Sequence, residues 1–193
     1  MTIISLSGAQ GTGKSSCLNS LRKLGFKTID QKTSRSILAE WNTTLHDVNK
    51  SHETTKRFQD EILRRHYDNI KDKIDSPDVY FQERSFADVF AYGINILGPF
   101  NEYNEYMDQY YKDCAKAQQA YKQIFYLANR PSNTVLDDGV RSTGEHFCTM
   151  MDSVIETFLG EFNDNDDVVY IDTINHDERI KIIVNTLVIK GLI

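Results

Sequence analysis

An eight-residue run near the N-terminus has the residue types and the spacing of a phosphate-binding loop. From Gly8 to Ser15 it reads Gly-Ala-Gln-Gly-Thr-Gly-Lys-Ser and fits the pattern G-x-x-x-x-G-K-[ST]. Glycines let the backbone turn so that successive N–H groups point at phosphate oxygens, while the lysine adds a cation and the serine hydroxyl a ligand for Mg²⁺. This P-loop predicts the binding of ATP and Mg²⁺ by Gly8, Gly11, Thr12, Gly13, Lys14, Ser15 and Ser16.

The residues on either side of the P-loop supply the elements that must position it. Ile3, Ile4 and Leu6 indicate a short buried strand before the loop, and leucines at helical spacing follow it as far as Gly25. A helix that starts at the loop directs the positive end of its dipole toward bound phosphates. A glycine-rich turn that fits the pattern by chance is therefore the weaker alternative.

A charged segment follows the second expected strand, which covers residues 26–30. Asp30 ends this strand, and Lys32 and Arg35 come shortly after it. Parallel strands deliver such residues to the carboxyl edge of a sheet, where ligands bind. Asp30 could accept a proton or a sugar hydroxyl there, and the two cations could contact an anion. A solvated loop is an equally good interpretation, because Lys and Arg are mostly surface residues.

A second junction of this kind follows the strand expected over 79–82. Glu83, Arg84 and Ser85 come directly after that strand and before a helix. A carboxylate at the end of a buried strand beside the P-loop can hold Mg²⁺, and a neighbouring arginine can reach a transferred phosphoryl group. A structural Glu–Arg pair at the surface is the alternative.

A polar segment over about 129–144 carries two further arginines, Arg130 and Arg141. Pro131 and Gly144 interrupt regular structure at its two ends. A segment of this kind after a late strand could fold over bound phosphates as a lid, with both arginines contributing to catalysis. An ordinary exposed loop is the alternative.

Strand and helix patterns alternate along the whole chain. Further strands are expected over 123–128 and 168–171, and helices over 36–41, 53–75, 101–122, 145–160 and 176–190. This order predicts one α/β domain over 1–193, a doubly wound parallel sheet of about five strands with ligands at the strand ends. The strand order does not follow from it. Gln59, Arg64 and Arg65 are expected to face partly away from the core, and the tyrosines of the 101–122 helix to pack rather than to stack on a base.

The composition excludes several classes of protein. A net charge of −6 argues against a protein that coats duplex nucleic acid. Cys17, Cys114 and Cys148 lack the spacing of a zinc site or a disulfide framework and suit a reducing cytoplasm. Neither a membrane span nor a signal peptide is expected. All five histidines are expected at the surface or at helix caps.

Several of these motifs together resemble the small P-loop kinases, which include the ribosylnicotinamide kinase domain, deoxynucleoside and deoxynucleotide kinases, and bacteriophage relatives. The run over 137–142, Asp-Asp-Gly-Val-Arg-Ser, is similar to the lid of the ribosylnicotinamide kinase domain. Glu83-Arg84-Ser85 and Phe58-Gln59 resemble the deoxynucleoside kinases, where the matching Glu and Arg serve the phosphates and the Gln contacts the base. Many relatives have a Glu after the second strand where this chain has Lys32, which leaves the general base open.

The resemblance implies a nucleoside or nucleotide kinase fold and transfer of the γ-phosphoryl group of ATP to a small acceptor. The catalytic residues would be Lys14, Asp30, Glu83, Arg84, Arg130 and Arg141. The acceptor would contact Lys32, Arg35 and Gln59, and Mg²⁺ would contact Ser15 and Glu83. The two cations that follow Asp30 favour a deoxynucleoside monophosphate as acceptor, while a deoxynucleoside and nicotinamide riboside stay open.

Other functions of a P-loop protein stay open as well. The chain lacks the [NT]-K-x-D motif with which GTPases read guanine, and it lacks an apolar run that ends in an Asp-Glu pair. A non-catalytic or regulatory ATP-binding module is the remaining alternative, because sequence indicates binding more surely than turnover. The oligomeric state, a homodimer included, does not follow from the sequence.

Overall fold

Five parallel strands form one sheet in the order β2-β3-β1-β4-β5. The strands are β1 (Thr2–Ser7), β2 (Lys27–Ile29), β3 (Val79–Glu83), β4 (Gln123–Leu127) and β5 (Val168–Ile171). This arrangement comes from a computed structural model that describes residues 2–29, 34–129, 144–163 and 166–193. Chain order reverses at β1, which pairs with β3 on one side and with β4 on the other. The predicted doubly wound parallel sheet is confirmed, and its switch point falls at β1, the strand that leads into the P-loop.

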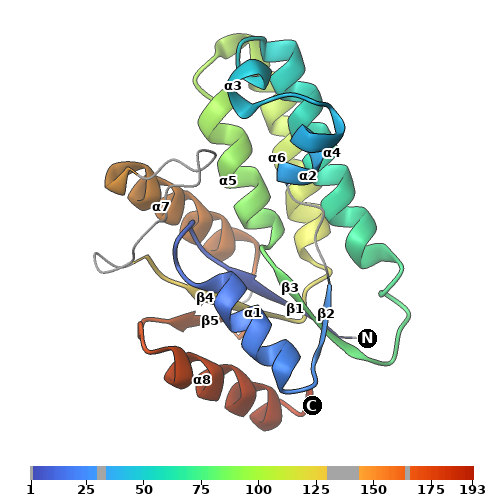
Figure 1. Cartoon of the computed structure of the whole chain (residues 1–193), viewed down its shortest axis with the longest axis vertical. Coiled ribbons are helices and arrows are strands. Elements are labelled where there is room, and N and C mark those ends of the chain that lie inside the picture. The colour runs from blue at the N-terminus through green and yellow to red at the C-terminus, as the bar shows by residue number, and fades with distance from the viewer. Residues whose placement is uncertain (1, 30–33, 130–143, 164–165) are drawn as a thin grey trace.

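Helices cover both faces of the sheet (Figure 1). One face carries α1 (Lys14–Lys23) and α8 (His176–Ile189), and the other carries α4 (His52–Lys71), α5 (Phe86–Leu97), α6 (Asn104–Gln118) and α7 (Glu145–Phe162). A short 3₁₀ helix, η1 (Asn101–Tyr103), precedes α6. No helix in the described ranges combines the length and the apolar character that a membrane crossing requires.

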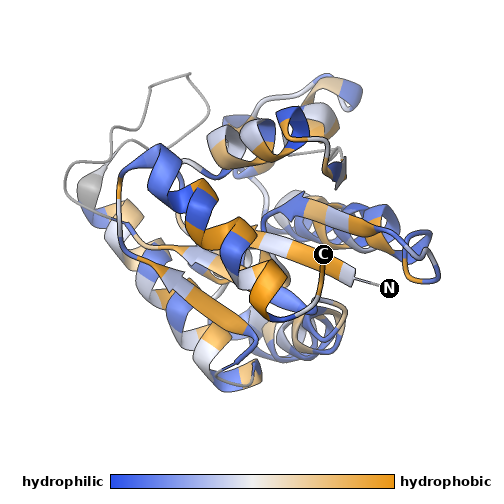
Figure 2. Ribbon diagram, turned by 90° about the horizontal axis from the view of Figure 1, so that it is seen from below, coloured by the Kyte–Doolittle hydropathy of each residue, from blue (hydrophilic) through white to orange (hydrophobic). Residues whose placement is uncertain are grey.

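The strands bury side chains on both faces, as parallel strands between two helical layers must. On β1, Ile3 packs toward α4–α7 while Ile4 and Leu6 pack toward α1 and α8. Phe125 of β4 joins the second cluster, and its neighbour Tyr126 joins the first. In Figure 2 the apolar residues run along these strands at the centre of the molecule. The two cores therefore lie on opposite faces of one sheet, because successive side chains of each strand point to alternate faces.

A third, smaller core joins two short helices to α4. These helices are α2 (Ser34–Glu40) and α3 (Leu45–Val48), and we call residues 34–48 the cover. Ile37, Leu38 and Val48 of the cover pack with Phe58 of α4. In Figure 1 the cover lies at the end of α4 and α5 that extends beyond the sheet. The cover thus closes over the carboxyl edge of the sheet, where the ligands are expected.

An ion-pair network also holds the cover on α4. Arg65 donates hydrogen bonds to Glu40 of α2 at 2.5 and 2.9 Å, and to Glu61 of its own helix at 2.5 Å. The Arg65 side chain is only 10% exposed, whereas that of Arg64 is 59% exposed. The prediction that Arg65 and Gln59 face partly away from the core is wrong, because the cover and its neighbours bury that side of α4.

Most element boundaries fall within two residues of those predicted, and three larger differences occur. The short helix α3 was not predicted, because its four residues are too few to display a helical period. The helix expected over 53–75 begins at His52, with Ser51 as its N-cap, and ends at Lys71. The helix expected over 101–122 is divided into η1 and α6. Tyr103, Tyr106 and Tyr110 pack in or against the core as predicted.

Candidate functional site

The P-loop joins β1 to α1 through left-handed glycines. Gly8, Gly11 and Gly13 have φ values of 137°, 80° and 92°. A Cβ atom at Gly8 would lie 2.4 Å from the carbonyl oxygen of Leu127, so only glycine fits beside β4. The loop therefore curls tightly at the carboxyl end of the central strand, with the start of α1 behind it.

Two side chains of the loop are held by its own carbonyl groups. The Lys14 ammonium donates to the oxygens of Gly8 and Ala9 at 2.5 and 2.6 Å, and the residue is 6% exposed. The Thr12 hydroxyl donates to the oxygen of Ala9 at 2.9 Å. Lys14 thus lies across the mouth of the loop, where a cation can reach phosphate oxygens, while Thr12 supports the curl.

Asp88 ties the P-loop to the junction between β3 and α5. The fully buried carboxylate accepts hydrogen bonds from the Ser7 hydroxyl at 2.6 Å, the Gly8 N–H at 3.1 Å and the Ser85 N–H at 2.8 Å. With Ser85 it forms the capping box at the start of α5. No role was predicted for Asp88, although the Ser-x-x-acid spacing signals such a cap. This tie fixes Glu83 and Arg84 relative to the loop.

Arg84 turns the chain sharply after β3. Its φ is 70°, in the left-handed region, and its N–H donates to the carbonyl oxygen of Leu6 at 2.8 Å. Such a backbone costs about 1–3 kcal/mol in a residue other than glycine and is found most often at functional sites. The guanidinium lies 5.7 Å from the centre of the Tyr92 ring on α5. The turn directs both Glu83 and Arg84 toward one cavity.

A buried polar cluster lies next to the turn at Arg84. The ring of His66 lies within hydrogen-bond distance of the Tyr121 hydroxyl, at 3.0 Å, and of the Gln82 amide, at 3.3 Å. Burial, together with the nearby charge of Arg84, lowers the pKa of His66 from its ordinary 6.5 to about 3. His66 is therefore neutral, and the prediction that every histidine lies at the surface or at a cap is wrong. Its burial depends on Tyr121, a contact that the sequence does not display.

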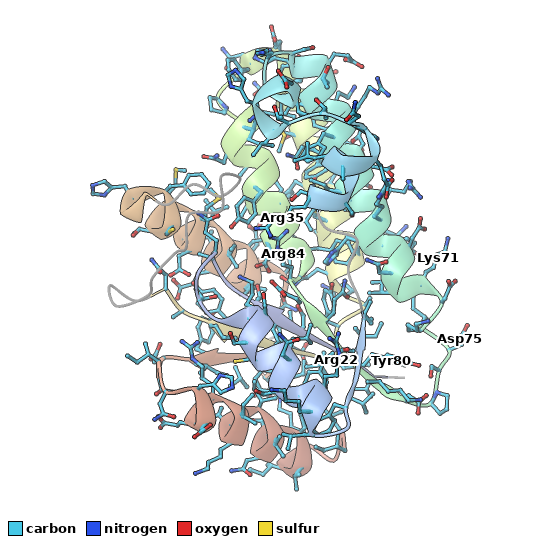
Figure 3. The ribbon with its side chains drawn as sticks, viewed as in Figure 1. Arg22, Arg35, Lys71, Asp75, Tyr80 and Arg84 are labelled. Carbon is cyan, nitrogen blue, oxygen red and sulfur yellow. The ribbon has the colours of Figure 1, made fainter. Side chains whose placement is uncertain are left out.

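A cavity of about 750 Å³ connects the P-loop with the cover. At one end it is lined by Gln10, Gly11, Gly13, Lys14, Ser15 and Ser16, next to Glu83, Arg84 and Asp88. At the other end it is lined by Phe58, Gln59 and Ile62 of α4 and by Arg35 of α2. In the view of Figure 3, Arg35 and Arg84 lie close to one another in the region between α1 and α5. The structure thus brings Arg35, Gln59, Glu83 and Arg84 together with the P-loop.

Gln59 has an unusual position in this cavity. The residue is 2% exposed, and its Oε1 atom has no hydrogen-bond partner among the described residues. A buried amide oxygen without a donor costs about 1–3 kcal/mol, so a ligand with an N–H group would relieve it.

Four other predicted site residues, Asp30, Lys32, Arg130 and Arg141, lie outside the described residues, as does almost all of the expected lid segment.

The match to a family of known sequences covers most of the chain. The model of the AAA domain family AAA_28 matches residues 3–179. The chain belongs to this family. A search of curated proteins with the sequence found no match.

Solved structures share the fold of this AAA domain. The NadR protein in complex with NR superimposes with a TM-score of 0.70 at 15% identity, over 96% of this chain and 50% of that chain. Deoxyadenosine kinase from M. mycoides superimposes with a TM-score of 0.69 at 18% identity with dATP bound, over 96% of this chain and 99% of that chain. With dCTP bound, the same kinase gives 0.67 at 20% identity, over 96% and 98%.

The sequence match defines the family, and the similarity to the solved structures defines the fold. The chain spans about half the length of the NadR chain and nearly the whole length of the deoxyadenosine kinase. Both proteins belong to the groups that the motifs resembled, so the predicted resemblance to small P-loop kinases is confirmed.

The AAA domain also offers oxygen ligands suited to Mg²⁺. The Ser15 hydroxyl and the Glu83 carboxylate line the same cavity as Lys14. No group of three or more His, Cys, Asp or Glu side chains that could hold a metal occurs in the described ranges. Mg²⁺ needs no such cage, since one or two protein oxygens, waters and substrate phosphates commonly complete its shell. Ser15 and Glu83 therefore fit the ion, whereas the Asp88 carboxylate is occupied by the hydrogen bonds that anchor the loop.

Proposed function

We propose that this protein transfers the γ-phosphoryl group of ATP to a nucleotide or nucleoside, with a deoxynucleoside monophosphate as the preferred acceptor. The observation that carries the proposal is the single cavity that runs from Lys14 and Ser15 to Phe58 and Gln59. Phosphoryl transfer requires a donor and an acceptor in line in one enclosed space. A cavity with a P-loop at one end and an apolar chamber at the other meets that requirement.

The donor end supplies charge and position. Lys14 would follow the phosphate oxygens, and Arg84, which lines the same cavity, would contact the transferred group. Mg²⁺ held near Ser15 and Glu83 would neutralise charge on the β- and γ-phosphates. The hydrogen bonds of Asp88 keep these groups at fixed separations, which matters because positioning accounts for most of the catalysis of this reaction.

The acceptor end suits a planar ring with a hydrogen-bond donor. Phe58 and Ile62 give apolar contact, and Gln59 provides the unpartnered oxygen described above. An exocyclic amino group or a ring N–H of a nucleobase would satisfy it. Deoxyadenosine kinase with bound dATP or dCTP is a protein of the same fold that holds such bases.

Two guanidinium groups favour an acceptor that already carries a phosphate. Arg35 and Arg84 line the same cavity, and no ion pair of Arg84 with a carboxylate occurs within the described part of the chain. A phosphate dianion can accept paired hydrogen bonds from such groups. Lys32 would add a third cation, and Arg130 and Arg141 would close over the phosphates. If the acceptor were a nucleoside instead, Asp30 would take the proton of its hydroxyl.

A deoxynucleoside is the second candidate acceptor. Gln59 favours it, because the resemblance to deoxynucleoside kinases rests on Phe58-Gln59 and the buried Gln59 amide lines the cavity.

The three free and buried cysteines, Cys17, Cys114 and Cys148, suit a reducing compartment, and we propose the cytoplasm.

ADP release, measured with and without each of a panel of acceptors, tests the proposal. Deoxynucleoside monophosphates should give the highest kcat/KM, followed by deoxynucleosides and nicotinamide riboside. A preference for deoxynucleosides would transfer the assignment to the second candidate. ATP binding without any acceptor-dependent release of ADP would instead indicate a non-catalytic nucleotide-binding module.

A further inference from the structure

Arg179 of α8 reaches the back of the P-loop. The residue is 5% exposed, and its Nη1 donates to the carbonyl oxygen of Thr12 at 2.5 Å. Its Nε donates to the carbonyl oxygen of Thr173, in the turn between β5 and α8, at 2.6 Å. A Cβ atom at Gly13 would lie 2.8 Å from the same Nη1. One guanidinium therefore joins the tip of the P-loop to the far end of the chain.

The contact with Thr12 determines where the next N–H group points. A trans peptide is planar, so the carbonyl of Thr12 and the N–H of Gly13 lie on opposite sides of the bond that joins the two residues. Because Arg179 holds the carbonyl on its own side, the N–H of Gly13 is directed the other way. Gly13 lines the cavity, and its N–H is one of the groups expected to face a phosphate.

The charge of Arg179 has no counter-ion among the described residues. Its contacts there are the two carbonyl oxygens and Cys17, and its Nη2 is buried without a hydrogen-bond partner. Burial raises the pKa of the Cys17 thiol above its ordinary value of 9.0, so this thiol is neutral at pH 7. A buried cation without an anion is unfavourable, and a phosphate chain on the other side of the loop would offset it.

We propose that Arg179 is a positioning residue of the nucleotide site: it fixes the Thr12–Gly13 peptide from behind and adds a second positive charge to the loop. The proposal rests on the proposed ATP site. Lys14 would contact the phosphates directly from the cavity side of the loop. Arg179 would act from the other side, by orienting the Thr12–Gly13 peptide and by the electrostatic attraction of its positive charge for the phosphates. Arg179 therefore tunes the affinity for ATP and leaves the acceptor end of the cavity alone.

Two substitutions separate the hydrogen bonds of Arg179 from its charge. Arg179→Met removes both at nearly constant volume, and Arg179→Lys keeps the charge but cannot reproduce the fork of donors. Lys181→Met is the matched control, because it removes one charge from an exposed position on the same helix. Calorimetric titration with ATP and Mg²⁺, and the rise of Tm on adding ATP, are measured for each variant.

Arg179→Met should weaken ATP binding by about tenfold to a hundredfold, because the Gly13 N–H would no longer be held toward the phosphate and one hydrogen bond to a charged group would be lost. The ATP-induced rise of Tm should be reduced accordingly. Arg179→Lys should fall between this variant and the wild type, and Lys181→Met should match the wild type. Once ATP is saturating, KM for the acceptor should be unchanged in all three. The N–H resonance of Gly13 should shift less on ATP addition in Arg179→Met than in the wild type.

A merely structural arginine would give a different result. If Arg179→Met lowers Tm but binds ATP as tightly as the wild type, the proposal is overturned. If Arg179→Met does not fold, Arg179→Lys decides: weaker ATP binding supports the proposal and unchanged binding overturns it. A wild-type protein that binds ATP but phosphorylates no acceptor would refute the proposed function alone, and the Arg179 comparison would still hold.

Discussion

Lys14 is the residue for which the expected effect of substitution is most direct. Its ammonium group lies over the loop carbonyls at the end of the cavity where the phosphates are expected. Lys14→Ala should lower kcat by about a hundredfold or more and weaken ATP binding, because the cation that offsets charge on the transferred group is lost. Lys23→Ala, at an exposed position near the end of the same helix, should have no effect. Turnover of Lys14→Ala at the wild-type rate would refute the assignment of the P-loop.

Glu83 and Arg84 are neighbours with different expected roles. Glu83→Gln keeps the shape and removes the charge, so it should raise the Mg²⁺ concentration needed for half-maximal rate. Arg84→Ala should lower kcat by a similar or larger factor, but added Mg²⁺ should not restore the rate, because a contact with the phosphoryl group is lost. Rates measured over a Mg²⁺ titration distinguish the two. An unchanged Mg²⁺ requirement in Glu83→Gln would count against its role as a metal ligand.

His66 makes stability depend on pH in a defined direction. Its pKa is lowered by burial from 6.5 to about 3 in the folded protein, so between these values the unfolded chain binds a proton that the folded chain does not. The free energy of unfolding should therefore fall as pH is lowered through this window, by about 1 kcal/mol per pH unit from this group. Urea titrations at several pH values measure the slope. His66→Gln should flatten it, whereas His46→Gln, at an exposed site, should keep the wild-type slope.

At the scale of the elements, the position of the cover should control acceptor binding. Arg65 joins α4 to Glu40 of α2, the helix that carries Arg35 into the cavity. Arg65→Met should release α2 and raise KM for the acceptor by about tenfold or more, since displacement of a contact by even 1 Å is costly, while KM for ATP stays nearly fixed. Arg64→Met is the matched control, because Arg64 is exposed and its ion pairs within the described part of the chain are with Glu61 and Asp68 of its own helix. Equal acceptor KM values in the two variants would contradict this role of the cover.

The sequence predicted elements and motifs well where the signal is local. The P-loop, the strand-end pair Glu83 and Arg84, and the five strands all follow from a residue pattern within one short segment. The ties between segments did not follow from the sequence. Asp88 acts on a loop 80 residues earlier in the chain, and Arg179 on one 167 residues earlier. Such contacts depend on the strand order, which alternation alone leaves undetermined.

Burial was also misjudged on α4. The polarity of Gln59, Arg65 and His66 suggested that they face solvent, although helical spacing places Gln59 three residues before Ile62 and His66 four residues before Ile70, on the apolar side of the helix. Burial comes from other elements: the cover meets Arg65, and Tyr121 and Gln82 meet His66. Arg65 and His66 have hydrogen-bond partners in their buried positions, as burial requires, whereas the Gln59 oxygen has none among the described residues.

At the scale of the whole molecule, the carboxyl edge of the sheet brings the two halves of the site together. β1 delivers the P-loop, and β3 delivers Glu83 and Arg84 beside it. The cover, held on α4 by its own small core, then closes the acceptor end. The proposed donor site lies on the main sheet and the proposed acceptor site under a separately packed cover, so the two could respond to ligands independently. Whether the chain unfolds as one unit is thus a question about function as well as about stability.

The position of the single tryptophan allows that question to be answered. Trp41 directly follows α2 and packs edge-on against Phe58 at a ring separation of 5.9 Å, so its fluorescence reports on the cover, whereas far-UV circular dichroism reports on the whole sheet and its helices. If residues 1–193 form one domain, the two signals should lose structure at the same urea concentration. ATP at a hundred times its Kd should raise the stability seen by both probes by about 2.7 kcal/mol. A fluorescence transition at lower urea, unmoved by ATP, would instead show that the cover unfolds by itself and that the donor and acceptor ends of the cavity are thermodynamically separate.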